Sequence, residues 1–319
     1  MNKAIFLSLF LLGFISCSKD ENPVARNENY SPEAKFKDGM IDSPTRGIWW
    51  WQDPESSYGT THVIGNQNLE NFAVLQFKTM RIDKVYGSYN GNLFTNSQVL
   101  KNWNSKLYNQ KIKSSLLLGE NTWIYPEIRP QLIEIVTNNV VNFNKSCQMR
   151  SEIFTSLHLD IEPQALPSWN FPKRRRGLVQ YLLETYKDVR SELDKNGQAG
   201  VLLYADLPDW IDNFETNNSV GWRSAADRDQ WYTDLSAILD GITLMAYEKQ
   251  ISSVINTTSY ERTHCSIPVE IGLNFSDSIW LNNYSYFMQN VSALENNTHC
   301  KVVIHSYSSI APSNPIDSK

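Results

Sequence analysis

The stretch SLHLDIEP, residues 156–163, lies near the middle of the 319-residue chain and alternates apolar with polar side chains. Such alternation is typical of a β-strand, whose successive side chains point to opposite faces. The polar face of this strand carries His158, Asp160 and Glu162. In a half-exposed antiparallel sheet these three side chains would meet water, whereas in a closed parallel barrel they would point into the interior. The rest of the chain decides between the two cases.

Seven other short apolar runs are separated by longer segments with helical spacing. The expected strands cover residues 46–51, 80–86, 113–119, 154–162, 200–206, 241–248, 269–273 and 301–307. The expected helices lie near residues 67–78, 97–110, 126–146, 173–196, 226–239, 250–263 and 278–297. This alternation over about 270 residues predicts an α/β fold, a single-domain parallel (β/α)8 TIM barrel over residues 44–319. An open doubly wound sheet is the alternative, but no glycine-rich phosphate loop follows a strand.

In such a barrel the polar side of SLHLDIEP faces the interior and its leucines and isoleucine face the helices. Glu162 then lies at the C-terminal rim, where barrel enzymes hold their catalytic groups, with Asp160 and His158 below it. Burial of unpaired ionisable groups costs on the order of several kcal/mol, so these residues need a compensating network or a function. A structural salt-bridge role for Asp160 and Glu162 is the alternative interpretation.

Composition and charge exclude some classes of partner. Hydrophobic residues make up 41% of the chain, enough for a large core, and the formal net charge is −5. This acidic balance predicts no extended basic surface of the sort that neutralises the phosphates of a nucleic acid, so no nucleic acid is expected as a partner. No clustered Cys/His spacing predicts a metal site. We expect no cofactor and a monomeric protein.

The N-terminus has the pattern of an export signal. Lys3 precedes an apolar run over residues 4–15, which is followed by Cys17 and is too short to span a membrane. This pattern resembles a bacterial lipoprotein signal, so residues 1–17 are predicted to be a signal peptide with Cys17 as the lipidated residue. An ordinary secreted protein cut elsewhere is the alternative.

The polar segment after Cys17 predicts where the protein resides. Its start, SKDEN, resembles the tether of Bacteroidetes-type lipoproteins on the outer face of the outer membrane. Residues 18–43 have no apolar period and are expected to form a flexible linker. The prediction is a cell-surface lipoprotein of the bacterial outer membrane that contacts the membrane only through its lipid.

Three further cysteines, Cys147, Cys265 and Cys300, follow in the chain. Cys265 and Cys300 each precede one of two neighbouring expected strands, the seventh and the eighth. Neighbouring parallel strands lie about 5 Å apart, within reach of a disulfide. A Cys265–Cys300 disulfide is therefore predicted.

SLHLDIEP and the later stretch DGITLMAYE, residues 240–248, together resemble glycoside hydrolase family 18, the chitinases and endo-β-N-acetylglucosaminidases. That family carries D-G-x-D-x-D-x-E at the end of barrel strand four and M-x-Y-D at the end of strand six. Asp160 and Glu162 match the final D-x-E, while Met245, Tyr247 and Glu248 match M-x-Y-D with glutamate for aspartate. Both motifs fall on the fourth and sixth expected strands.

The chain departs from the first family motif in three places. Thr155 and His158 replace its first two aspartates, and Ser156 replaces its glycine. Because His158 occupies the inward position below Asp160, the proton network there differs from that of the family.

The resemblance implies a retaining hydrolase that cleaves β-linked N-acetylglucosamine glycans. Glu162 would be the general acid and base, and the substrate's own acetamido oxygen would be the nucleophile. Asp160 would orient that acetamido group, and Tyr247 would donate a hydrogen bond to its carbonyl. The expected partner is therefore a carbohydrate substrate.

Further substrate-binding candidates follow from position at strand ends alone. Each of them could instead solvate a loop or cap a helix. The candidates are Trp51, Tyr86, Glu120, Tyr204, Asp206, Met245, Glu248 and Tyr307.

Two other functions remain open at this point. The chain could be a surface glycan-binding lipoprotein on the same barrel that has lost turnover, which the replacement of the upstream aspartates favours. It could also be a barrel hydrolase of another family, in which Glu162 and Glu248 face each other at roughly 5 Å as acid and nucleophile.

Overall fold

The apolar runs of the sequence form the strands of one closed parallel barrel. The computed structural model describes residues 45–214 and 219–314. The strands are β1 Arg46–Trp50, β2 Ile82–Gly87, β3 Lys113–Leu118, β4 Ser156–Leu159, β5 Leu202–Pro208, β6 Gly241–Met245, β7 Val269–Asn274 and β8 Val302–His305. Each pairs in parallel with the next, and β8 closes the barrel on β1. The predicted (β/α)8 fold is confirmed, while the predicted signal peptide, Cys17 and linker lie outside the described residues.

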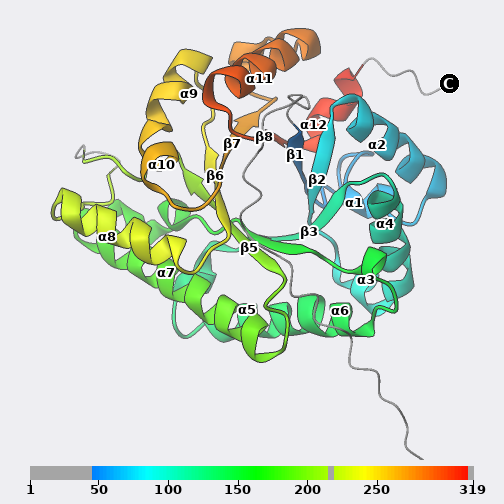
Figure 1. Ribbon diagram of the computed structural model, residues 1–319, viewed down its shortest axis with the longest axis horizontal. Helices are drawn as coiled ribbons and strands as arrows, with labels where there is room; N and C mark the ends of the chain where they lie inside the picture. Colours follow the sequence, from blue (N-terminus) through cyan, green and yellow to red (C-terminus); the bar gives the residue numbers. More distant parts are fainter. Residues whose placement is uncertain (1–44, 215–218, 315–319) are drawn as a thin grey trace, which may run out of the picture. The chain divides into compact units, whose positions relative to one another are not determined.

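Helices surround the barrel on its outside (Figure 1). They are α1 Thr60–Val63, α2 Gln67–Thr79, α3 Gly91–Thr95, α4 Ser97–Asn109, α5 Arg129–Val136, α6 Phe143–Ser146, α7 Pro172–Lys195, α8 Ala225–Ser236, α9 Ile251–Thr257, α10 Ser259–His264, α11 Tyr284–Thr298 and α12 Tyr307–Ile310. Short 3-10 segments are η1 Asn121–Ile124, η3 Arg150–Glu152, η4 Pro163–Ala165, η5 Pro167–Asn170, η6 Ser278–Trp280 and η7 Ala311–Ser313, and the π-helical turn η2 Thr137–Asn142 joins α5 to α6. Each expected helix is thus found.

Strand β4 ends earlier than the sequence predicts. The last ladder contact is from the Asp160 N–H to the Leu118 carbonyl, at 2.8 Å. The Glu162 N–H instead donates to the side chain of Asn121 at 2.7 Å, and Pro163, which has no N–H, begins η4. Asp160 and Glu162 therefore stand on the irregular segment just beyond the strand, at the mouth of the barrel.

Trp50 is a centre of the core between strands and helices. It is fully buried, and its ring centroid lies 5.6 Å from that of Phe77, 5.4 Å from that of Trp103 and 4.9 Å from that of Tyr307. The leucines and isoleucine of SLHLDIEP belong to the same outer core. Their outward direction confirms the alternation predicted for β4.

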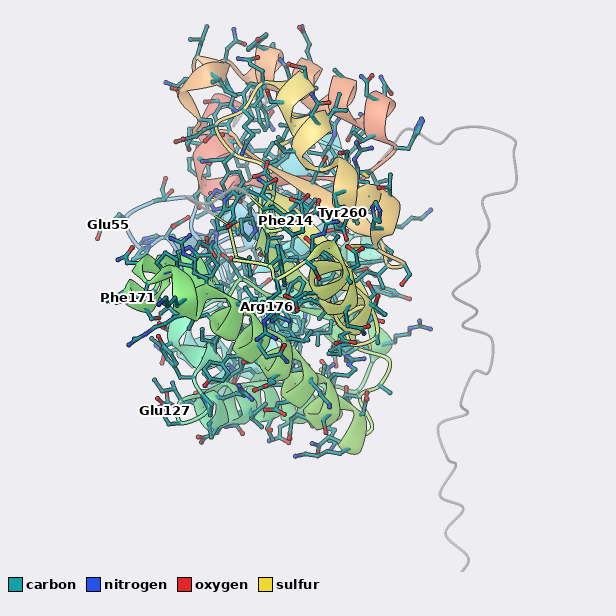
Figure 2. The ribbon with its side chains drawn as sticks, turned by 90° about the vertical axis from the view of Figure 1, so that its left-hand side faces the viewer. Glu55, Glu127, Phe171, Arg176, Phe214 and Tyr260 are labelled. Carbon is teal, nitrogen blue, oxygen red and sulfur yellow. The ribbon has the colours of Figure 1, made fainter. Side chains whose placement is uncertain are left out.

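Long-range ion pairs link elements that are distant in sequence. Arg46 on β1 binds both carboxylate oxygens of Glu295 on α11, at 2.6 and 2.8 Å, and both side chains are buried. Arg176, labelled on α7 in Figure 2, forms a partly buried pair with Asp227 on α8 at 2.9 Å.

None of the helices in the described ranges is long and apolar enough to cross a lipid bilayer.

The predicted Cys265–Cys300 disulfide is wrong, because both thiols are free. The ladder pairs Val302 with Ile271, so Cys300 is level with Val269, which lies four residues beyond Cys265. Cys265 follows directly on α10, while the Cys300 sulfur lies 3.6 Å from the Thr298 carbonyl. Although β7 and β8 are adjacent, their register does not place Cys265 opposite Cys300.

Removing one member of the Arg46–Glu295 pair tests how the barrel is closed. Glu295→Ala leaves a buried guanidinium without its carboxylate, so the free energy of unfolding is expected to fall by about 3–5 kcal/mol in urea titrations. Asp194→Ala, which removes a half-exposed partner of Arg190 on α7, is the control and is expected to change stability by less than about 1 kcal/mol. Equal effects of the two substitutions would contradict a structural role for the buried pair.

Candidate active site

Alternate residues of the strands fill the barrel interior. Trp49, Tyr86, Leu117 and Val303 form a small apolar cluster there, on which Trp51 packs. The ring of His158 joins them, with its centroid 6.1 Å from that of Trp49 and 4.3 Å from that of Tyr86. The inward direction predicted for His158 is therefore confirmed.

Asp206 on β5 is the polar partner of this layer. One of its carboxyl oxygens lies 2.5 Å from His158 Nε2, and the other accepts a hydrogen bond from Trp49 Nε1 at 3.1 Å. Burial lowers the pKa of His158 to about 3 and raises that of Asp206 well above its usual range. Both directions leave the proton on Asp206, which donates it to a neutral imidazole.

A second set of polar contacts lies deeper in the barrel and includes Tyr86 and Tyr204, which were predicted to bind substrate. The hydroxyl of Tyr86 donates to Glu270, which also pairs with Lys84 at 3.8 Å. Lys84 Nζ lies 3.3 Å from the centre of the Tyr204 ring, and burial lowers its pKa to about 8. Tyr86 and Tyr204 were expected to bind substrate, but both are buried in this packed layer.

Asp160, which the register of β4 and β5 places level with Asp206, lies with Glu162 at the mouth of the barrel. Burial raises the pKa of Asp160 well above its usual range, and the nearby Glu162 raises it further when ionised. Its Oδ1 atom is buried and has no hydrogen-bond partner in the described part of the chain. An orphaned buried oxygen is costly, so this atom is suited to accept a hydrogen bond from a ligand.

Glu162 is half-buried and held by its neighbours. Burial raises the pKa of its carboxyl, while a hydrogen bond from Gln164 Nε2 to Oε2, at 2.5 Å, lowers it. A partly buried carboxyl with a raised pKa can hold a proton for transfer to a substrate.

Tyr247 reaches the same place from the end of β6. Burial raises the pKa of its phenol, and the nearby acids Asp160 and Glu162 raise it further when ionised. No hydrogen bond from its hydroxyl to another described residue is formed, which leaves this donor free. The structure thus brings together the three residues predicted to be catalytic.

The other two residues of the strand-six motif differ in position. Met245 is partly buried at the inward-facing end of β6. Glu248 is exposed, adopts a left-handed backbone with φ of 57°, and donates its N–H to Asp277 at 2.5 Å. Its carboxylate forms no ion pair or hydrogen bond with the rest of the described chain.

Trp51 lies across the mouth of the barrel. Its indole N–H donates to His305 Nε2 at 3.2 Å, and burial lowers the pKa of this histidine to about 4. A Cβ added to Gly119 would lie 3.3 Å from the Trp51 ring and 2.8 Å from the Asp160 carbonyl oxygen. Trp51 therefore stands beside the segment that carries Asp160.

Two further candidates do not line the mouth. Tyr307 is buried in the outer core, where its hydroxyl donates to Gln76 at 2.7 Å, and its assignment to substrate binding is wrong. Glu120 is exposed and caps η1 by accepting from the Thr122 N–H at 3.1 Å. His305, which the sequence reasoning missed, takes the place given to Tyr307; alternation along β8 from the inward Val303 would have found it.

No metal site accompanies these residues. Among the residues that the structure describes, no group of three or more His, Cys, Asp or Glu side chains could hold a metal ion.

Known protein families and curated proteins give no match to the sequence. Solved structures do share the fold. The glycoside hydrolase domain of PgaB (BpsB) from Bordetella bronchiseptica has a TM-score of 0.51 at 10% identity, over 86% of this chain and 97% of that one. A β-1,4-mannanase from the sea hare Aplysia kurodai has 0.53 at 10% identity, over 88% and 93%. An exo-β-1,4-mannosidase from Opitutaceae bacterium strain TAV5 has 0.50 at 12% identity, over 82% and 51%. At such identities the likeness establishes the barrel fold alone.

The protonation of His158 can be measured directly. Its folded-state pKa of about 3 lies below the ordinary value of 6.5, so its contribution to stability is lost as the pH falls through this window. The ¹⁵N ring shifts are expected to show a neutral, Nδ1-protonated imidazole from about pH 8 down to about pH 5. His158→Gln assigns the signal, and a doubly protonated ring near pH 6 would contradict the neutral pair with Asp206.

Proposed function

We propose that this protein is a retaining glycoside hydrolase that cleaves β-linked glycans at N-acetylglucosamine, with the acetamido group of the substrate as nucleophile. One observation carries the proposal: the buried, unpartnered Oδ1 of Asp160 lies in one site with the raised-pKa carboxyl of Glu162 and the free hydroxyl of Tyr247. An amide presents one N–H and one carbonyl oxygen, which match Asp160 and Tyr247 respectively.

The first chemical step follows from these roles. Glu162 donates its proton to the glycosidic oxygen while the acetamido oxygen attacks the anomeric carbon, and the bond to the leaving sugar breaks. Asp160 accepts a hydrogen bond from the acetamido N–H through its unpartnered Oδ1, which orients the group and disperses the positive charge that develops on it. Tyr247 donates to the acetamido oxygen and holds it in line.

The second step reverses the proton transfer. Glu162, now a carboxylate, takes a proton from water, whose oxygen attacks the anomeric carbon. The bond between this carbon and the acetamido oxygen breaks, which restores the acetamido group. Two displacements on one carbon give retention of configuration. Trp51, whose ring is partly exposed beside Asp160, would support the sugar at which this happens.

The alternative with Glu248 as nucleophile has less support. Glu248 is exposed, whereas Asp160, Glu162 and Tyr247 are partly buried. A nucleophilic carboxylate works best where water is excluded and its position is held. Glu248 is therefore assigned no covalent role in the proposal.

The place of action is a part of the same proposal. A lipid at Cys17 and the polar residues 18–43 would tether the barrel to the outer face of a bacterial outer membrane. A glycan substrate outside the cell would then reach the mouth directly.

Glu162→Gln tests the proposal because it keeps the shape of the side chain and removes the acid. Release of sugar from an N-glycosylated protein or from chitooligosaccharides is expected to fall by about a thousandfold or more. Glu248→Gln is the matched control and is expected to retain activity. Binding of these glycans without cleavage by the unmodified protein would instead favour a glycan-binding role, and loss of cleavage in both variants would favour the Glu162–Glu248 pair.

Gln164 offers a test through pH. Its hydrogen bond lowers the pKa of Glu162, so Gln164→Met is expected to raise that pKa and move the alkaline limb of kcat/KM to higher pH. The acid is protonated below its pKa, so a higher pKa extends activity upward. Gln180→Met, a change on α7 away from the mouth, is the control. A limb that stays in place would show that Glu162 is not the titrating acid.

A further inference from the structure

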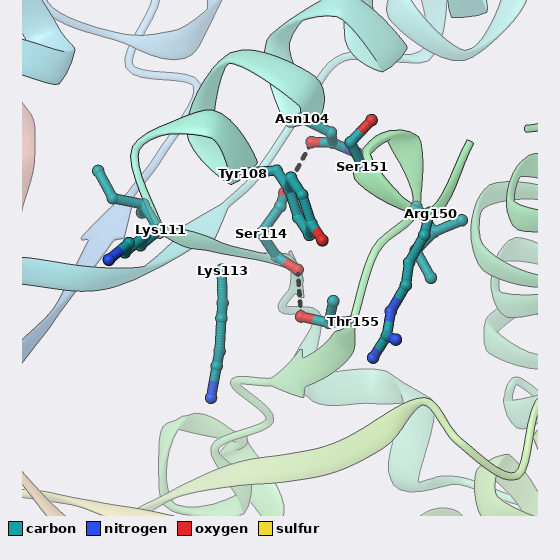
Figure 3. A pocket seen from close by; sticks show the side chains of 10 residues that line it. Asn104, Tyr108, Lys111, Lys113, Ser114, Arg150, Ser151 and Thr155 are labelled. Atoms are coloured by element: carbon teal, nitrogen blue, oxygen red, sulfur yellow. Dashed lines mark hydrogen bonds between the residues drawn. The ribbon is translucent and has the colours of Figure 1, made fainter. Parts of the chain in front are cut away.

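A cleft of about 500 Å³ lies at the end of the barrel opposite the mouth (Figure 3). Lys113 begins β3, and Thr155 immediately precedes β4, so the cleft opens where these strands start. The end of α4 and the segment before β4 form its other walls. Its lining residues are Asn104, Tyr108, Lys111, Ile112, Lys113, Ser114, Arg150, Ser151, Ile153 and Thr155.

The charge of this cleft is entirely positive. Lys111, Lys113 and Arg150 line it, and no Asp or Glu does. All three cations are exposed, and none of them forms a side-chain hydrogen bond or an ion pair within the described ranges. In a chain with a formal net charge of −5, three unpaired cations around one cleft make a local site for an anion.

Stabilisation of α4 does not account for all three cations. Lys111 lies close after the C-terminal end of α4, where a positive charge is favourable to the helix dipole. Arg150 comes from a different segment, and Lys113 from β3. In Figure 3 the Lys113 and Arg150 side chains extend in the same direction, on either side of Thr155.

The floor of the cleft is polar but already bonded. Ser114 Oγ donates to Asn104 at 2.7 Å, and Thr155 Oγ1 donates to the Ser114 carbonyl at 3.1 Å. Since these groups satisfy each other, the cations are the main groups left for a charged ligand. Tyr108, half-exposed with a relative exposure of 50%, adds an aromatic face to the wall.

We propose that this cleft binds a sugar that carries a sulfate or phosphate ester. The cations would bind the tetrahedral anion, and Tyr108 would pack on the apolar face of the sugar ring. A volume of about 500 Å³ admits a monosaccharide or disaccharide. The site is separate from the mouth and does not depend on the proposed catalytic function.

Calorimetric titration of the barrel protein tests this proposal with four probes: glucose 6-sulfate, glucose 6-phosphate, glucose and inorganic sulfate. Glucose lacks the acetamido group expected at the mouth, and the Glu162→Gln background keeps catalysis out of the measurement. Both esters, or one of them, are expected to bind more tightly than glucose and than inorganic sulfate. Whichever ester binds more tightly identifies the source of the anion.

Three variants locate the binding. The combined Lys111→Gln, Lys113→Gln and Arg150→Gln protein is expected to bind the ester about tenfold more weakly or worse. Lys173→Gln, Arg174→Gln and Lys187→Gln on α7 remove the same charge elsewhere and are expected to leave binding unchanged. Tyr108→Ala is expected to weaken the ester but not inorganic sulfate.

Three outcomes would overturn the proposal. These are unchanged ester binding in the cleft variant, equal binding of glucose and its esters, and inorganic sulfate that binds as tightly as the esters. The last would leave a bare anion site without recognition of a sugar.

Discussion

The polar interior of this barrel depends on the short contact between the buried carboxyl of Asp206 and the ring of His158. Neither group could stay in the barrel alone, because an unpaired buried charge costs on the order of several kcal/mol. As a neutral hydrogen-bonded pair they carry no net charge, and Trp49 completes the bonding of Asp206. Asp206 is level with Asp160 in the register of the barrel, and Asp160 in turn lies near Glu162.

The same pair stands where SLHLDIEP differs from the family 18 motif that it resembles. Where that motif has an aspartate below the D-x-E acids, this chain has His158, and the carboxyl that His158 contacts comes from β5. Register places His158 opposite Tyr204, so Asp206 is level with Asp160. A carboxyl therefore still lies beside Asp160, although a neighbouring strand supplies it, and burial raises the pKa of Asp160.

Particular elements show how far the residues alone could lead. The alternation in SLHLDIEP was sufficient to turn His158 inward and the leucines outward, because strand side chains alternate strictly. The same rule, applied to β8, selects His305 rather than Tyr307, which lies beyond the end of the strand and faces the helices. The predicted Cys265–Cys300 disulfide was wrong because the adjacency of two strands does not specify the level at which their residues pair.

The sequence by itself determined the barrel, its strand order and the acids at the end of the fourth strand, since periodicity and chain order are local properties. Only the tertiary structure decided that Asp206 is hydrogen-bonded to His158 and that Glu270 accepts a hydrogen bond from Tyr86. It also decided that Lys111, Lys113 and Arg150 line one cleft. These contacts join residues that are far apart in the chain. Their pairing depends on barrel register and on side-chain packing, which no local pattern encodes.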